Sequence, residues 1–209
     1  MENILLVLKD GVLTFFLYAI VAVFAQNAIF NRALGVSRLL KLVEDPTLDT
    51  LLFGVLLCII QVVSCVLGFF ANKLFGVILG EMRFFVRPLL MVLCMAVAYV
   101  AIFFLVVFFY KKSNVKTVVE VLPLACFNCC ILGTLLTTVT RNYTFLETLA
   151  FAIGSAVGYV LAVLLVTEGQ RKLRNRNIPQ SFKGLPANLV YIGILALAIY
   201  GFTGHMPVF

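Results

Sequence analysis

Long apolar runs separated by short polar segments dominate the pattern of this chain. Six of these runs are near the length that a hydrocarbon core of about 30 Å requires of a spanning helix. They predict an all-α integral membrane protein with six transmembrane helices in a single domain, residues 1–209. The predicted spans are Val12–Phe30, Leu51–Phe70, Leu89–Tyr110, Val115–Thr138, Leu146–Val166 and Leu189–Phe202.

Composition supports the same fold class. Of the 209 residues 63% are hydrophobic and only 12% are charged, more apolar surface than a soluble domain of this size could bury. Segment 71–87, between the second and third spans, mixes apolar and charged residues and predicts an interfacial helix. The small residues Gly154 and Gly158, one turn apart in the fifth span, predict close packing against another helix.

The charges of the loops predict the orientation in the membrane. The net charge is +7, but the basic residues lie in short loops between apolar runs, which favours membrane topology over nucleic-acid binding. Loops 32–48, 111–117 and 168–186 alternate with the other loops and carry eleven of the 16 Lys and Arg residues. Because basic loops stay in the cytoplasm, we expect both termini to face outward.

The fourth span is unusual because it contains polar and thiol-bearing side chains: Pro123, Cys126, Asn128, Cys129 and Cys130. In hydrocarbon, water cannot satisfy the backbone groups freed by a proline or the amide of an asparagine, so each needs a protein partner. Thiols are soft ligands that suit iron–sulfur clusters and zinc. In the alternative interpretation, cysteine is a small hydrophobe among packed helices and Pro123 is a tolerated kink.

An internal similarity links the first and fourth spans. The sequence Phe-Asn-Arg-Ala-Leu-Gly of residues 30–35 resembles Phe-Asn-Cys-Cys-Ile-Leu-Gly of residues 127–133, with one residue of slack. Three spans separate the two, which predicts two inverted three-helix halves with the first and fourth helices broken near the bilayer midplane. We expect these breaks, near 27–34 and 123–130, to lie close together, with Asn27, Asn31 and Asn128 satisfied by protein partners.

The segment Leu122–Gly133 resembles the L-P-L-x-x-x-N-C-x-x-L-G motif of the Rnf/Nqr membrane-subunit family, most closely the A-type member of Rnf and the E-type member of Nqr. The stretches 154–158 and 178–184 resemble the family patterns F-x-x-A-x-G and V-P-x-x-F-[RK]-G. Near the start, residues 26–37 align without gaps on N-N-F-x-L-x-x-x-L-G-x-C. The resemblance therefore covers nearly the whole chain.

This resemblance implies six helices in two inverted halves with helices one and four broken, in a bacterial-type inner membrane. It also implies a subunit, not catalytic alone, of a complex that passes electrons between a reduced carrier and NAD, coupled to Na⁺ or H⁺ translocation. The implied partners are a homologous membrane subunit, other subunits of the complex and the lipid bilayer.

In the family, one cysteine from each broken helix, in each of two homologous subunits, holds a [2Fe–2S] cluster. Cys129 matches the second ligand position, whereas Ser37 occupies the first. Serine binds iron far less readily than thiolate does. A cluster could be held by three thiolates and Ser37, Cys126 or Cys130 could substitute, or the chain could be a paralogue that has lost the cluster.

Two classes of function therefore remain. The first is a membrane subunit of an electron-transfer-driven ion pump, which Cys129 and the long family resemblance favour. The second is a cluster-free small transporter or membrane scaffold built on the same inverted-repeat fold, which Ser37 favours.

The orientation can be tested by labelling from outside the cell. A probe cysteine introduced at Asn175, in the most basic of the three loops, should be protected from an impermeant thiol reagent in intact cells. A probe cysteine at the C-terminus should be labelled. The opposite labelling pattern would show that the basic loops face outward.

Overall fold

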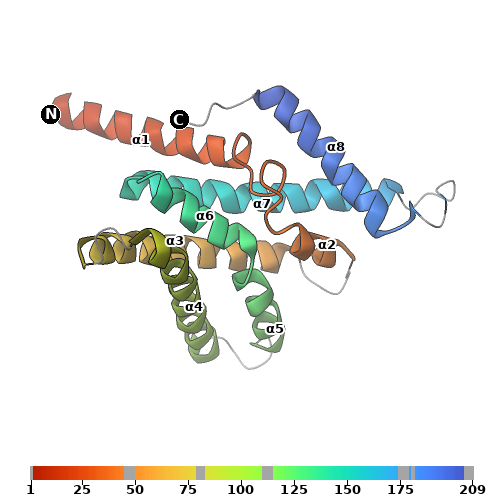
Figure 1. Cartoon of the computed structure of the whole chain (residues 1–209), viewed down its shortest axis with the longest axis horizontal. Coiled ribbons are helices and arrows are strands. Elements are labelled where there is room, and N and C mark those ends of the chain that lie inside the picture. Colours follow the sequence, from red (N-terminus) through yellow and green to blue (C-terminus); the bar gives the residue numbers. More distant parts are fainter. Residues whose placement is uncertain are drawn as a thin grey trace.

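The computed structural model of the chain describes residues 2–44, 50–78, 83–109, 115–173, 179 and 182–204, and these residues form helices joined by turns (Figure 1). The first half contains α1 (Glu2–Val23), α2 (Val36–Glu44), α3 (Thr50–Ile78) and α4 (Arg83–Phe109). The second half contains α5 (Val115–Cys126), α6 (Cys129–Thr140), α7 (Phe145–Leu173) and α8 (Leu185–Thr203).

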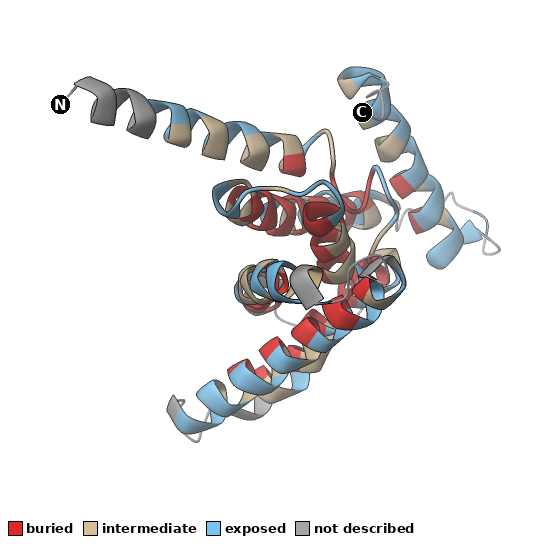
Figure 2. Cartoon of the chain, turned by 60° about the vertical axis from the view of Figure 1, so that its left-hand side comes forward, coloured by how far each residue is buried: buried red, intermediate tan, exposed pale blue. Residues whose placement is uncertain are grey.

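The described helices are those of a multi-pass membrane protein. Helices α3, α4, α7 and α8 are each long and apolar enough to cross a membrane, and the bent pair α5–α6 meets the same criterion as one span. The predicted first span corresponds to α1 and the turns after it. Its described apolar side chains are largely exposed, as lipid contact requires; they include Val12, Leu13, Phe16, Leu17 and Ile20 (Figure 2).

The predicted interfacial helix at 71–87 was wrong. Helix α3 continues without interruption through Ile78, and α4 already begins at Arg83. Extending an existing helix adds one hydrogen bond for each residue fixed, whereas a separate helix needs a new nucleus. Asn72 and Lys73 therefore lie in the extended end of α3, and Arg83 and Arg87 lie at the start of α4.

The middle helix of each half packs against the last helix of its own half and against the broken helix of the other half. Helix α3 packs against α4, α5 and α6, and α7 packs against α8, α1 and α2. In each half, a broken helix is followed by two long ones, and the middle helices α3 and α7 contact each other. Figure 1 shows α3 and α7 running in opposite directions, as expected for halves of opposite orientation.

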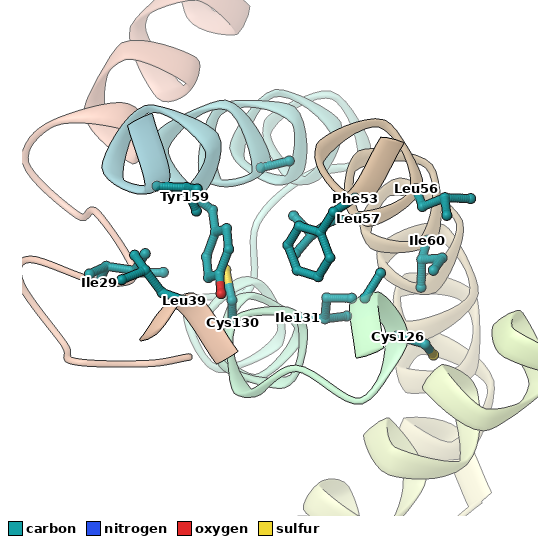
Figure 3. Close-up of a cluster of buried hydrophobic side chains, with 14 of the residues drawn as sticks. Ile29, Leu39, Phe53, Leu56, Leu57, Ile60, Cys126, Cys130, Ile131 and Tyr159 are labelled. Atoms are coloured by element: carbon teal, nitrogen blue, oxygen red, sulfur yellow. The ribbon is translucent and has the colours of Figure 1, made fainter. Parts of the chain in front are cut away.

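The core lies between α3, α6 and α7, beside the bend between α5 and α6 (Figure 3). Phe53 of α3 and Tyr159 of α7 are almost fully buried, and their ring centroids lie 6.0 Å apart. The other large side chains that are almost fully buried here include Leu57, Ile60, Ile131 and Leu135. Such packing fixes the position of α6 against the two long helices.

Glycines bring α1 close to α7, as the small-residue spacing predicted. A Cβ added at Gly154 would contact the carbonyl oxygen of Ala19 and lie 2.9 Å from its Cα. One turn later, a Cβ added at Gly158 would lie 3.0 Å from Nδ2 of Asn27. Neither position has room for a larger side chain, so both glycines set the distance between the two helices.

We expect Gly154→Ala to destabilise the protein by about 1–3 kcal/mol, because the new methyl group meets backbone that cannot move away without shifting α1. Thermal unfolding of the purified chain in mild detergent measures this as a lower Tm.

The matched control is Gly193→Ala in α8, where no atom lies within 4 Å of the added Cβ. That substitution should leave Tm unchanged or raise it, because alanine favours the helix. Equal Tm values for the two variants would contradict the close α1–α7 packing.

Candidate functional site

The first break, residues 24–35 between α1 and α2, is organised by one buried amide. Oδ1 of Asn27 accepts hydrogen bonds from the N–H groups of Ile29 at 2.9 Å and Phe30 at 3.3 Å. Its Nδ2 donates to the carbonyl oxygens of Val23 at 2.8 Å and Gly158 at 3.1 Å. Asn27 therefore satisfies groups freed at the end of α1 and ties the break to α7.

The second break, Phe127 and Asn128, separates α5 from α6. Asn128 has an extended backbone (φ −110°, ψ 130°), and its Oδ1 accepts from the N–H of Cys130 at 3.0 Å, so it is the N-cap of α6. Asparagine favours this position because its side chain replaces a missing backbone partner. Pro123 lies inside α5, and its carbonyl accepts from the N–H of Phe127 at 3.0 Å.

The two breaks meet at Gly35, the buried last residue of the first break. A Cβ added here would contact Oδ1 of Asn128 and lie 2.9 Å from Cε2 of Tyr159. The hydroxyl of Tyr159 donates to the carbonyl oxygen of Gly35 at 3.1 Å. The predicted closeness of the breaks is therefore confirmed, and α7 supplies the side chain that joins them.

Further contacts hold the first break along α6. A Cβ added at Gly133 would contact Cδ1 of Leu34, and Nη1 of Arg32 donates to Oγ1 of Thr137. The chain from Arg32 to Gly35 thus runs antiparallel to α6. Asn31 is exposed and donates to the carbonyl of Ala25 at 2.5 Å, so it stabilises the break internally and does not join the second break.

Ser37 and Cys129 occupy similar positions at the starts of the two half-helices. Ser37 is the second residue of α2, and Cys129 is the first residue of α6. Both side chains are exposed, while Gly35 and Asn128, just before them, are in contact. The positive ends of two short helices are therefore brought together beside a hydroxyl and a thiol.

Cys126 and Cys130 are fully buried and face different helices. Sγ of Cys126 lies 3.7 Å from the carbonyl oxygen of Met95 in α4. Sγ of Cys130 lies 3.7 Å from Oγ of Ser155 in α7. Figure 3 shows the two side chains pointing to different sides of the core. With Cys129 at the surface, the three neighbouring thiols have three separate surroundings.

Residues 15–206 match the protein family described as "Rnf-Nqr subunit, membrane protein". The chain belongs to the Rnf-Nqr subunit family. The matched residues include both breaks and every helix from the second half of α1 onward. The two breaks therefore lie within the segment that matches the family.

Curated relatives in the Rnf-Nqr family are named as subunits of ion-translocating complexes. The A-type member of an ion-translocating oxidoreductase complex from Syntrophotalea carbinolica is 41% identical over 86 residues, which cover 41% of this chain and 45% of the relative. The E-type member of a Na⁺-translocating NADH-quinone reductase from Chlamydia muridarum is 41% identical over 83 residues, 40% of this chain and 34% of the relative. The chain thus spans less than half the length of each relative.

Sequence reasoning missed a buried polar cluster behind the second break. Nε2 of Gln61 in α3 donates to Oγ1 of Thr134 in α6 at 3.0 Å, and Thr134 lies 3.0 Å from Oγ of Ser155 in α7. Thr134 also donates to the carbonyl of Cys130 at 2.9 Å. The sequence did contain a signal for this cluster: Gln61 carries an amide within an otherwise apolar span, and such side chains need hydrogen-bond partners inside the membrane.

Gly35 allows a sharp test of the contact between the breaks. Its φ of +79° is costly for alanine, and the added methyl group would also overlap Asn128 and Tyr159. Gly184 has a similar φ of +83° but no atom within 4 Å of an added Cβ.

We expect both Gly35→Ala and Gly184→Ala to incur a backbone cost of about 1–2 kcal/mol. Only Gly35→Ala should add a packing cost of about 1–3 kcal/mol, seen as a larger decrease in Tm. Equal decreases in the two variants would mean that the breaks do not meet at Gly35.

Proposed function

We propose that this chain is a membrane subunit of an Rnf/Nqr-like ion-translocating electron transport complex. Such a complex would transfer electrons between a reduced carrier and NAD and couple this to movement of Na⁺ or H⁺. The observation that carries the proposal is the family match over residues 15–206, together with relatives named as subunits of ion-translocating oxidoreductases. Alone, the chain would not be catalytic.

The proposed partners are a homologous membrane subunit and further subunits that carry redox groups. The apolar surface of the described helices supports such an assembly within the bilayer. Phe85 and Phe108 of α4 and Phe202 of α8 are 90%, 85% and 94% exposed, so lipid or neighbouring subunits must cover them. The exposed starts of α2 and α6, with Ser37 and Cys129, form a second surface that a partner could contact.

The proposed orientation has both termini outside the cytoplasm in a bacterial-type inner membrane. It rests on the distribution of basic residues, eleven in the loops 32–48, 111–117 and 168–186 against five elsewhere. With this orientation, the turn between α6 and α7 would face outward.

The donor atoms available here do not fit a [2Fe–2S] cluster held by two thiolates from each subunit. At the two exposed positions the chain offers one thiol, Cys129, and one hydroxyl, Ser37. A neutral hydroxyl supplies neither the charge nor the softness of a thiolate. Cys126 and Cys130 are enclosed by other helices, so we infer that neither replaces the missing thiol without repacking.

Affinity purification from native membranes tests the proposed assembly. The tagged full chain, extracted in mild detergent, should co-purify in fixed stoichiometry with a homologous membrane subunit and with flavin- or iron–sulfur-carrying subunits. Recovery of the chain alone or as a homo-oligomer would favour the second candidate, a cluster-free small transporter or membrane scaffold. Ser37 is the observation that keeps this candidate open.

The role of Ser37 can be tested by restoring the thiol. When the chain is produced with its co-purifying subunits, Ser37→Cys should create or strengthen iron–sulfur absorbance and an EPR signal upon reduction. Adding Cys129→Ala to this variant should remove the new signal, because a cluster needs both thiolates from this chain.

The matched control is Thr140→Cys, which adds an exposed thiol at the other end of α6. This variant should leave the spectrum unchanged. A complete cluster in the unmodified protein that survives Cys129→Ala would refute the assignment of both positions.

A further inference from the structure

A cavity of about 320 Å³ lies at the end of the bundle remote from the start of α6. Its lining residues come from the last turns of α3, the end of α6, the turn 141–144 and the first turn of α7, and Figure 1 shows where these elements lie. Six of its lining residues carry polar side chains that are not aromatic: Asn72, Lys73, Thr138, Asn142, Thr144 and Thr148.

Thr148 gives this cavity an unsatisfied donor. The residue is only 2% exposed, and its Oγ1 has no hydrogen-bond partner among the described residues. A buried hydroxyl without a partner costs about 1–3 kcal/mol, so such a group in the wall of a cavity indicates that something polar occupies the space. By contrast, Thr138 in the same wall donates to the carbonyl of Leu135 at 3.0 Å.

The charge around the cavity favours an anion. Lys73 is the charged residue in its lining, and Arg141 directly precedes the lining residue Asn142. The start of α7, with its positive helix dipole, lies at the same place. A carboxylate also lies at this turn: Oε2 of Glu147 accepts from the N–H of Thr144 at 2.8 Å and so caps the turn.

The position of the cavity is that of a membrane interface. Tyrosine is enriched at headgroup depth in membrane proteins, and the ring centroid of the lining residue Tyr143 lies 5.0 Å from that of Tyr18. The ring centroid of Phe145 lies 5.5 Å from that of Phe69 and 6.0 Å from that of Phe70. In α3, the polar residues Asn72 and Lys73 interrupt the apolar sequence two residues after Phe70.

We propose that this cavity binds a phosphate group, held by the ammonium of Lys73, the hydroxyl of Thr148 and the amides of Asn72 and Asn142. Lysine binds phosphate as a point charge, and neutral hydroxyl and amide donors complete the hydrogen bonding. The phosphate belongs either to the headgroup of a phospholipid or to a soluble phosphate ester. This inference does not depend on the proposed electron transport function.

Ligand-induced stabilisation of the delipidated full chain in mild detergent tests the proposal and separates the two sources. The probes are phosphatidylglycerol, diacylglycerol with the same acyl chains, and glycerol phosphate. Since a ligand that binds only the folded state raises Tm, phosphatidylglycerol should raise it saturably and diacylglycerol should not. A saturable effect of glycerol phosphate alone would identify a soluble ester as sufficient, whereas its failure would identify a lipid headgroup.

Two variants assign the effect to this cavity. Lys73→Gln should weaken the apparent affinity for phosphatidylglycerol at least roughly tenfold, because a charge-assisted hydrogen bond is lost. Thr148→Val should weaken it by about fivefold, yet leave Tm without ligand unchanged or higher, because an unpartnered hydroxyl is removed. A merely structural role for Thr148 would instead lower Tm without ligand.

The matched control is Lys172→Gln, which removes an exposed charge in the last turn of α7, at the opposite end of that helix from Thr148, and should bind as the unmodified chain does. Glu147→Gln keeps an oxygen for the N–H of Thr144 and should tighten binding, since it removes the nearby negative charge. Equal stabilisation by diacylglycerol, or unchanged affinity in Lys73→Gln, would overturn the proposal.

Discussion

A helix that is interrupted inside a membrane leaves backbone groups that water cannot reach, and the rest of this structure depends on how these groups are satisfied. Asn27 binds the last residue of α1 and the backbone within the first break, and Asn128 caps α6 after the second break. Gly35 lies against Asn128, and its carbonyl oxygen accepts a hydrogen bond from the hydroxyl of Tyr159. Each break therefore supports the other. Neither break would be stable as an isolated turn in lipid.

This constraint explains the packing around the breaks. Helix α7 reaches both breaks, through the carbonyl of Gly158 and the ring of Tyr159, and this requires α1 to lie close against it. The absence of a side chain at Gly154 allows that approach. Helix α4 contacts the second break through Tyr99, whose ring centroid lies 5.4 Å from that of Phe127. The outer surfaces of α4 and α8 remain open to lipid or to other subunits. The joined breaks therefore lie beside the buried core of the fold.

The sequence was sufficient to predict the class of fold and the location of both breaks, because amides and a proline stand out within apolar runs. It could not identify the residues that join the breaks. Position 35 requires glycine because its φ is positive and because there is no space for a side chain beside Asn128. Both are properties of the packed structure and cannot be read from the sequence. Gln61 carried a visible signal, but its partners on α6 and α7 depend on the rotation of three helices. The segment 71–87 was misinterpreted because composition does not distinguish an extended helix from a separate interfacial one.

Proximity cross-linking tests the central claim that the first break lies along α6 in the folded protein. In a chain without its native cysteines, the pair Leu34→Cys and Gly133→Cys places two thiols at a position where side chain and backbone are in contact. A short bifunctional thiol reagent should join this pair within native membranes, whereas the pair Leu34→Cys and Leu197→Cys, with the latter on the exposed face of α8, should not react. Failure of the first pair under conditions where both thiols are labelled singly would contradict the joined breaks.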